Sequence, residues 1–276
     1  MTICVSVRVA EGLVMAADSA VTLHIKRPEE ENEVIVLQTF NYASKLTQLS
    51  DFPMALLTWG LASIDNRTIQ SLLMEWESNP TCIKKLVEDG CKVQEVAQSI
   101  IDFIEKKYRS SFENYTQGKV NGCPPLGISV GGYSKGDFFA KQYVWEFPIS
   151  RQLSEARKDK EDGSPNFGAN WFGEVEALSR LFVGRTDRMA NSLLQAGVQK
   201  EILDKWWTSG EGALPLMFDG MPLQDAIDFA KFSVEVTIGV SRFSSGANTC
   251  GGDIDIAVIR PHELKWAQRK AWTIKD

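Results

Sequence analysis

The threonine near the N-terminus is the first residue of the sequence that could carry catalytic chemistry. Thr2 follows the initiator methionine, Met1, and a small residue at this position generally permits removal of the methionine. Thr2 would then carry a hydroxyl and a free α-amine, whose ordinary pKa is about 7.7 to 8. Because such an amine is largely neutral near physiological pH, it can take the proton of the hydroxyl on the same residue and activate it as a nucleophile.

Three further residue types would complete the requirements of acyl transfer, and each occurs within the first 60 residues. Lys45 could place an ammonium group beside the nucleophile, which would lower the pKa of both the hydroxyl and the amine. Asp18 could keep this lysine charged and oriented, and the backbone amide of Gly60 could donate to a developing oxyanion. This chemistry needs no histidine, and the chain has only two, His24 and His262.

A predicted hairpin brings the nucleophile close to the aspartate. Residues 2–9 and 12–17 read as two short strands, and the loop between them leads into a glycine. Antiparallel pairing about this loop puts Thr2 opposite Asp18, to within one register step.

A second predicted hairpin carries the other two residues. Residues 45–49 and 54–59 read as strands with a Ser-Asp-Phe-Pro turn between them. The same pairing rule puts Lys45 opposite Gly60. If the two hairpins lie side by side, all four candidate residues converge at one open end.

A serine within a G-x-S-x-G pattern is the competing nucleophile, in the run Gly127-Ile128-Ser129-Val130-Gly131. The α/β-hydrolase elbow that uses this pattern needs a strand, a sharp turn and then a helix. The residues after Gly131 predict a hairpin turn into another strand, so we interpret Ser129 as a strand serine. His262 follows Ser129, which is the chain order of a serine hydrolase, and the alternative stays open.

Blocks of strands and helices follow one another along the rest of the chain. Helical spacing of apolar residues predicts a helix over 92–113. The other predicted elements are helices at 65–77, 173–183, 187–206 and 222–240, and strands at 126–133, 138–147 and 254–259. Asp65 is expected to cap the first of these helices, and the charged stretches 26–33 and 148–165 are expected to be surface loops. Such a succession is typical of stacked sheet and helix layers.

The composition is that of a globular protein with a substantial core. The chain has 276 residues, of which 43% are hydrophobic and 24% charged. Its formal net charge of -6 disfavours a nucleic-acid partner, and no apolar run approaches the roughly 18 to 20 residues of a membrane span. The N-terminus lacks a signal-peptide pattern, and the five cysteines include no C-x-x-C pair. We therefore expect a cytoplasmic protein with reduced thiols and without a metal site or membrane association.

The N-terminal segment resembles a known family. Residues 2–7, Thr-Ile-Cys-Val-Ser-Val, and residues 12–19, Gly-Leu-Val-Met-Ala-Ala-Asp-Ser, look like the opening of proteasome β-type subunits and of the bacterial HslV-type peptidase. These proteins are N-terminal nucleophile (Ntn) hydrolases. Ser44-Lys45-Leu46 is similar to the segment with the family's catalytic lysine, and Thr58-Trp59-Gly60 resembles the glycine turn whose amide serves as an oxyanion donor. Cys250-Gly251-Gly252, before the last predicted strand, resembles the family's Ser-Gly-Gly loop.

The chain departs from the family in residues that support the catalytic group. Cys250 replaces the family's serine, and the family's aspartate before this loop falls where the chain has no acidic residue. Two segments look inserted, about 24–42 and 184–222. The resemblance implies a single domain over 1–276 of the α+β class, a four-layer αββα sandwich with an inserted helical segment.

The activity that the resemblance implies is hydrolysis of an amide or peptide bond by a threonine nucleophile. Thr2, Asp18, Lys45 and Gly60 would be the catalytic residues, without a metal or an organic cofactor. The substrate would be a peptide or a smaller amide, and the chain would assemble with copies of itself into rings or stacked rings. An ATP-dependent unfoldase partner stays open. Two alternatives also stay open, a catalytically inactive structural subunit and a small-molecule Ntn amidase.

Overall fold

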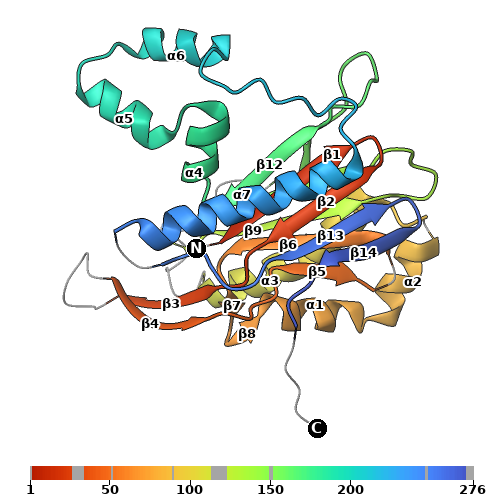
Figure 1. The fold of residues 1–276 in the computed structure, drawn as a ribbon. Helices are drawn as coiled ribbons and strands as arrows, with labels where there is room; N and C mark the ends of the chain where they lie inside the picture. Colours follow the sequence, from red (N-terminus) through yellow and green to blue (C-terminus); the bar gives the residue numbers. More distant parts are fainter. Residues whose placement is uncertain are drawn as a thin grey trace.

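Two five-stranded antiparallel sheets form the centre of the structure (Figure 1). The computed structural model describes residues 2–26, 34–50, 52–88, 90–112, 123–148, 152–245 and 248–271. The first sheet has the strand order β12-β1-β2-β13-β14, and the second has the order β11-β10-β9-β6-β5. The mixed α+β class expected from the sequence is confirmed.

The strands are short, and their bounds show which segments each sheet uses. The strands of the first sheet are β1 (Ile3–Val9), β2 (Gly12–Ala17), β12 (Gly168–Gly173), β13 (Asp255–Arg260) and β14 (Glu263–Gln268). The strands of the second sheet are β5 (Leu46–Leu49), β6 (Met54–Gly60), β9 (Leu126–Gly132), β10 (Lys141–Phe147) and β11 (Ser154–Ala156). Two small hairpins pair β3 (Val21–Lys26) with β4 (Val34–Phe40) and β7 (Ser63–Ile64) with β8 (Arg67–Thr68).

The helices fall into an N-terminal and a C-terminal group. The first group is α1 (Ile69–Glu77), α2 (Pro80–Glu88) and α3 (Val93–Phe112). The second group is α4 (Glu176–Leu178), the π-helical turn η1 (Ser179–Val183), α5 (Asp187–Gln195), α6 (Lys200–Ser209) and α7 (Leu223–Phe243).

The central strands of the first sheet are buried on both faces. Every residue of β1 and β2 is buried. Ile3 and Val5 of β1 belong to the core beneath α7, whereas Cys4 belongs to the core between the two sheets. A strand covered on both sides reads as a nearly continuous apolar run, which is why these two segments are recognisable in the sequence.

Helices cover the outer face of each sheet. α7 packs on β1 and β2, and its buried residues recur every three or four positions, as an amphipathic helix requires. α3 packs on β9 and β10 of the second sheet. Between the sheets, β2 contacts β5 and β6, and Met15, Leu57 and Trp59 share one apolar cluster. α5 and α6 lie apart from the sheets in Figure 1.

The first helix begins later than the sequence predicts. α1 starts at Ile69, and the hydroxyl of Thr68 caps it by accepting from the backbone N–H of Ser71 at 3.1 Å. Asp65 instead lies in the turn between β7 and β8, with a φ of 47°. Aspartate tolerates this left-handed conformation better than most residues, so the expected cap is a turn residue.

The sequence analysis does not predict α2 (Pro80–Glu88), β12 (Gly168–Gly173) or β14 (Glu263–Gln268). The predicted helix over 173–183 is shorter than expected, because β12 runs to Gly173 and α4 begins at Glu176. The predicted helix over 187–206 is divided into α5 and α6, and Gly197, between them, has a φ of 91°.

The two expected surface loops have different outcomes. Residues 27–33 of the loop 26–33 lie outside the described residues, and residue 26 belongs to β3. The loop 148–165 contains the short strand β11, which pairs with β10. A polar, charged segment can therefore still form an edge strand when its backbone pairs with a neighbour.

Candidate active site

The pairing of the first hairpin differs from the predicted one by a single residue. Cys4 pairs with Ala17, and the backbone N–H of Asp18 donates to the carbonyl of Ile3 at 3.3 Å. Asp18 therefore lies opposite Ile3, next to Thr2, which is within the one-step margin of the prediction.

The pairing of the second hairpin corrects the prediction for Lys45. Leu49 pairs with Met54, and the backbone N–H of Thr58 donates to the carbonyl of Lys45 at 2.9 Å. Lys45 therefore lies opposite Thr58, and the prediction that it opposes Gly60 was wrong. The turn is centred between residues 51 and 52, one residue earlier than the prediction assumed. Because moving the centre of a hairpin turn by one residue shifts every cross-strand partner by two residues, the partner of Lys45 is Thr58 instead of Gly60.

The two hairpins belong to different sheets. β1 and β2 form part of the first sheet and β5 and β6 part of the second, and the two pairs contact each other across the space between the sheets. The expectation that they lie side by side is therefore corrected to a face-to-face arrangement. This arrangement still brings Asp18, at the end of β2, to Lys45, directly before β5.

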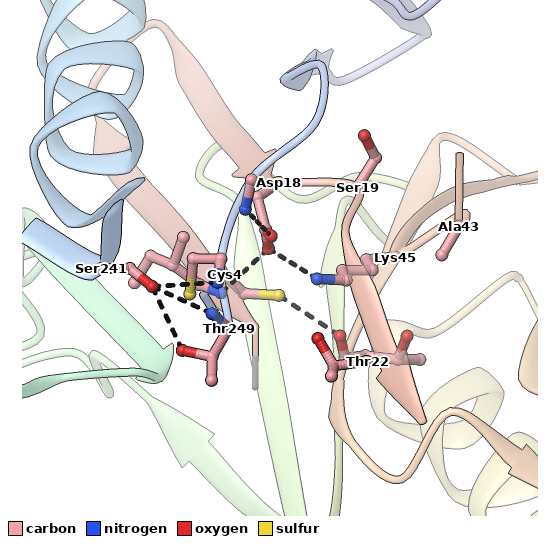
Figure 2. Close-up of polar contacts among 12 residues, drawn as sticks. Cys4, Asp18, Ser19, Thr22, Ala43, Lys45, Ser241 and Thr249 are labelled. Atoms are coloured by element: carbon pink, nitrogen blue, oxygen red, sulfur yellow. Dashed lines mark hydrogen bonds and ion pairs between the residues drawn. The ribbon is translucent and has the colours of Figure 1, made fainter. Parts of the chain in front are cut away.

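A buried ion pair joins the two charged candidates. The ammonium Nζ of Lys45 lies 2.7 Å from Oδ1 of Asp18, and the two residues are only 4% and 1% exposed. Figure 2 shows the Lys45 side chain directed at the Asp18 carboxylate. Removing two charges from water is costly unless they are paired and their remaining hydrogen-bonding capacity is used.

The Asp18 carboxylate also accepts two backbone hydrogen bonds. Oδ1 accepts from the N–H of Ile3 at 3.0 Å, and Oδ2 accepts from the N–H of Gly251 at 2.9 Å. Both carboxylate oxygens are therefore occupied, which fixes the plane of the group and the direction in which it presents its charge to Lys45. The N–H of Ile3 directly follows Thr2, so this bond ties the start of the chain to the ion pair.

Thr2 is held in place by the end of β12. It is buried, and its carbonyl accepts from the N–H of Glu174 at 2.7 Å. Gly173 has a φ of 86°, and a Cβ atom there would lie 2.0 Å from the carbonyl oxygen of Thr2. Only glycine permits this approach. Among the described residues, no hydrogen bond joins the Lys45 ammonium to the Thr2 hydroxyl.

Gly60 ends β6 close to the same place. It has a φ of 82°, and a Cβ atom there would lie 2.2 Å from the carbonyl oxygen of Pro125. The preceding residue, Trp59, stacks on Phe172 of β12 with ring centroids 4.5 Å apart. The Trp59 Cβ atom lies 3.5 Å from the Cβ position at Gly173, so the end of β6 reaches the strand end that holds Thr2.

The loop before β13 supports Asp18 from the other side. The carbonyl of Gly251 accepts from the N–H groups of Ser19 at 3.1 Å and Ala20 at 2.8 Å. Ser241 on α7 holds the loop, because its hydroxyl accepts from the N–H groups of Thr249 at 3.0 Å and Cys250 at 3.3 Å (Figure 2). The sequence indicates this loop through its glycines but gives no signal for Ser241.

The two cysteines beside the ion pair are poor nucleophiles. Burial raises the pKa of the Cys4 thiol far above its usual value, and the Cys4 thiol donates to the carbonyl of Thr58 at 3.4 Å. Burial, together with the nearby Asp18 carboxylate, raises the pKa of the Cys250 thiol to about 12. Both thiols are therefore protonated at neutral pH, whereas the thiolate is the reactive form.

The serine-hydrolase alternative is wrong for this structure. Ser129 lies in the middle of β9, which continues to Gly132 before the hairpin to β10. Its hydroxyl accepts from Nε2 of Gln142 at 2.7 Å, inside the core. No helix follows the strand within residues 126–147, and His262 is exposed in the turn between β13 and β14.

Metal and membrane signals are absent from the part of the chain that the structure describes. No group of three or more His, Cys, Asp or Glu side chains there could hold a metal ion. None of the helices there is long and apolar enough to cross a membrane.

Similar proteins are found by structure and not by sequence. No protein-family model matches the chain, and no curated protein sequence matches it. Anbu (ancestral beta-subunit) from Yersinia bercovieri is 14% identical with a TM-score of 0.52, and the match covers 96% of this chain and 86% of that one. The Anbu (Gly-1) mutant from Hyphomicrobium sp. strain MC1 is 17% identical with a TM-score of 0.54, covering 96% and 87%. The assignment to proteasome β-type or HslV-type subunits was therefore wrong in its family: the chain shares its fold with Anbu proteins.

Proposed function

We propose that the protein is an Ntn-type threonine hydrolase that cleaves an amide or peptide bond with Thr2 as its nucleophile. The proposal requires removal of the initiator methionine, which frees the Thr2 amine. One observation carries the proposal: a buried Asp18–Lys45 ion pair, whose carboxylate also accepts two backbone N–H groups, stands beside the start of the N-terminal strand. A buried charge pair of this kind is expensive, and such pairs are common where a protein must hold a charge at a reacting group.

The proposed reaction proceeds through an ester on Thr2. The hydroxyl oxygen of Thr2 bonds to the substrate carbonyl carbon, and the α-amine takes the hydroxyl proton. The positive charge of Lys45 stabilises the attacking oxygen, and the N–H of Gly60 donates to the oxyanion. The proton then passes to the leaving nitrogen as the C–N bond breaks. Water attacks the ester, its proton goes to the amine and then to the Thr2 oxygen, and the acid product leaves.

We also propose that the packing described above amounts to a four-layer αββα sandwich of the Ntn type. Its support is the position of α7 outside the first sheet and α3 outside the second, with an apolar core between the sheets. A single domain over 1–276 with insertions at about 24–42 and 184–222 is part of the same proposal. α5 and α6 fall within the second insertion and lie apart from the sheets, as an inserted helical segment would (Figure 1).

An electrophilic probe for N-terminal threonine tests the proposed function. Intact-mass measurement first establishes that the methionine has been removed. The probe should then add once, to Thr2, and Thr2→Ala should abolish both labelling and hydrolysis of a panel of peptides and small amides. Thr2→Ser keeps the hydroxyl and the amine and should retain part of the activity. Ser129→Ala is the matched control, because it removes another buried hydroxyl. The probe should label Thr2 in this variant to the same extent as in the unchanged protein.

A catalytically inactive subunit is the second candidate, and one observation favours it. Among the described contacts, the Lys45 ammonium bonds to Asp18 and not to the Thr2 hydroxyl. If protein with a verified N-terminal threonine neither labels nor cleaves any amide in the panel, the inactive subunit replaces the hydrolase.

Assembly and substrate size are further parts of the proposal. We expect the protein to associate with copies of itself. Light scattering coupled to size-exclusion chromatography would measure the mass of the assembly. Cleavage of folded or long peptides, compared with small amides, would separate a peptidase from a small-molecule amidase. An ATP-dependent unfoldase as partner stays a prediction that co-purification with such an enzyme would test.

A further inference from the structure

A second buried lysine–aspartate pair lies next to the proposed site. Lys270 follows β14 and is 7% exposed, and Asp255 begins β13 and is 3% exposed. The Lys270 ammonium forms an ion pair with Oδ2 of Asp255, and the backbone N–H of Lys270 donates to Oδ1 at 2.8 Å. The proposed chemistry does not use either residue.

This second pair is adjacent to the first along the sheet. Asp255 pairs with Ala17 across β13 and β2, and Ala17 directly precedes Asp18. The C-terminal segment that carries Lys270 therefore lies against the strand end that carries the Asp18 carboxylate.

The Lys270 ammonium makes one more contact, and that contact points to a role beyond stability. Nζ donates to the carbonyl of Ala43 at 3.2 Å, while the N–H of Ala43 donates to the carbonyl of Ser19 at 2.9 Å. Ala43 precedes Lys45 by two residues, and Ser19 directly follows Asp18. The segment that leads into Lys45 is thus held on both sides, by Ser19 on one and by Lys270 on the other.

We propose that Lys270 is a positioning residue for Lys45: its ammonium, anchored by Asp255, fixes the Ala43 carbonyl and so sets where the Lys45 ammonium lies relative to Thr2. Stability alone does not require this arrangement, because well-packed apolar residues in place of a buried ion pair often stabilise a protein equally or better. An ammonium with three donors can hold Asp255 and the Ala43 carbonyl together, which an apolar side chain cannot do. The inference rests on the proposed function of Thr2.

The test compares Lys270→Met with Lys265→Met in the full chain with its methionine removed. Lys265 lies on β14, is exposed, and pairs with Glu263 at 2.7 Å, so its substitution removes an ion pair that does not reach the site. The rate at which an electrophilic probe labels Thr2 is measured from pH 5 to 9. Lys270→Met should label at least about tenfold more slowly, since small misplacements at a reacting centre cost up to about a hundredfold. Its pH midpoint should rise, because a displaced Lys45 no longer lowers the pKa of the amine.

The controls separate positioning from a loss of folded protein. Lys265→Met should keep the rate and the midpoint, and Lys270→Arg, which keeps a charge and several donors, should restore most of the rate. An unchanged midpoint in Lys270→Met, with a rate that falls only as the folded fraction falls, would overturn the proposal. So would a rate equal to that of the unchanged protein. If Lys270→Met does not fold, Lys270→Met combined with Asp255→Asn, which leaves no unpaired buried charge, replaces it with the same expectations.

A measurement that needs no activity keeps this inference distinct from the proposed function. The N–H of Thr58 donates to the carbonyl of Lys45, so its hydrogen exchange reports the order of that segment. Lys270→Met should speed exchange at Thr58 more than at amides in the centre of β10, where strand pairing is independent of Lys270. If the unchanged protein never labels but this local increase occurs, the hydrolase proposal fails and positioning of Lys45 stands. Equal exchange at Thr58 in both proteins refutes positioning by Lys270.

Discussion

Replacement of Asp18 by asparagine would remove one buried negative charge and keep the shape of the side chain. The carboxylate accepts from Lys45 Nζ at 2.7 Å, from the N–H of Gly251 at 2.9 Å and from the N–H of Ile3 at 3.0 Å. Asparagine has one acceptor oxygen and one NH₂ group that only donates, so at least one backbone donor would face another donor. Lys45 would also be left in the core without a counter-charge.

The expected loss is large on the scale of protein stability. Removing one partner of a buried ion pair costs about 3 to 5 kcal/mol, and a buried donor without an acceptor adds about 1 to 3 kcal/mol. The whole free energy of unfolding of a typical domain is only about 5 to 15 kcal/mol. At about 2 to 4 °C per kcal/mol for a chain of this size, Asp18→Asn should lower Tm by at least about 8 °C.

Urea and thermal unfolding at pH 7 measure this effect, with a second substitution to identify its cause. Asp18→Asn combined with Lys45→Met removes the stranded charge, so the double variant should recover at least about 2 kcal/mol relative to Asp18→Asn alone. Glu263→Gln breaks an exposed pair to Lys265 with the same N···O distance of 2.7 Å and should leave Tm nearly unchanged. A loss below about 1 kcal/mol in Asp18→Asn, the size of an exposed ion pair, would refute the reasoning, as would a double variant less stable than the single one.

Three further outcomes are expected. Gly173→Ala would force a Cβ atom to within 2.0 Å of the Thr2 carbonyl oxygen, so probe labelling of Thr2 should fall by at least about tenfold. Ser129→Ala leaves Nε2 of Gln142 buried without its acceptor and should cost about 1 to 3 kcal/mol in urea unfolding while labelling of Thr2 continues. The raised pKa of Cys250, about 12, means that the unfolded chain loses this proton first as pH rises. The stabilisation from Cys250 is complete below about pH 8.5, and above that pH it falls by up to about 1.4 kcal/mol per pH unit. In unfolding curves from pH 8 to 11, Cys250→Ala should remove this part of the slope and leave the part due to Cys4, whose thiol pKa is raised as well.

Much of the central hairpin could be predicted from the sequence. β1 and β2 are continuous apolar runs separated by a short loop, and their observed bounds, Ile3–Val9 and Gly12–Ala17, agree with the prediction to within a residue. The contact between Asp18 and Lys45 was expected only if the two hairpins lay side by side; the hairpins instead face each other from different sheets, and this arrangement also brings the two side chains together. Their catalytic roles stay a prediction, because contact does not establish chemistry.

The supporting contacts could not be predicted because they depend on segments far apart in the chain. β12 reads Gly-Ala-Asn-Trp-Phe-Gly, which has neither a clear strand period nor a helical one, and it is a strand because β1 offers a free edge. Lys270 reads as an ordinary surface lysine near the end of the sequence. Its partners Asp255 and Ala43 are 15 and 227 residues away, and no local pattern encodes such a meeting.

The positions in the chain of the groups that donate to the Asp18 carboxylate determine how early in protein synthesis the candidate site can form. Ile3 and Lys45 are near the start of the chain, whereas Gly251 is separated from Asp18 by 233 residues. Contacts of such long range form late, because the intervening chain must be ordered first. A nascent chain that ends at β10 already contains Thr2, Asp18 and Lys45. It lacks Gly251, whose backbone N–H donates to Oδ2 of the Asp18 carboxylate. Thr2, the proposed nucleophile, is therefore synthesised well before Gly251, whose N–H completes the hydrogen bonds of the Asp18 carboxylate.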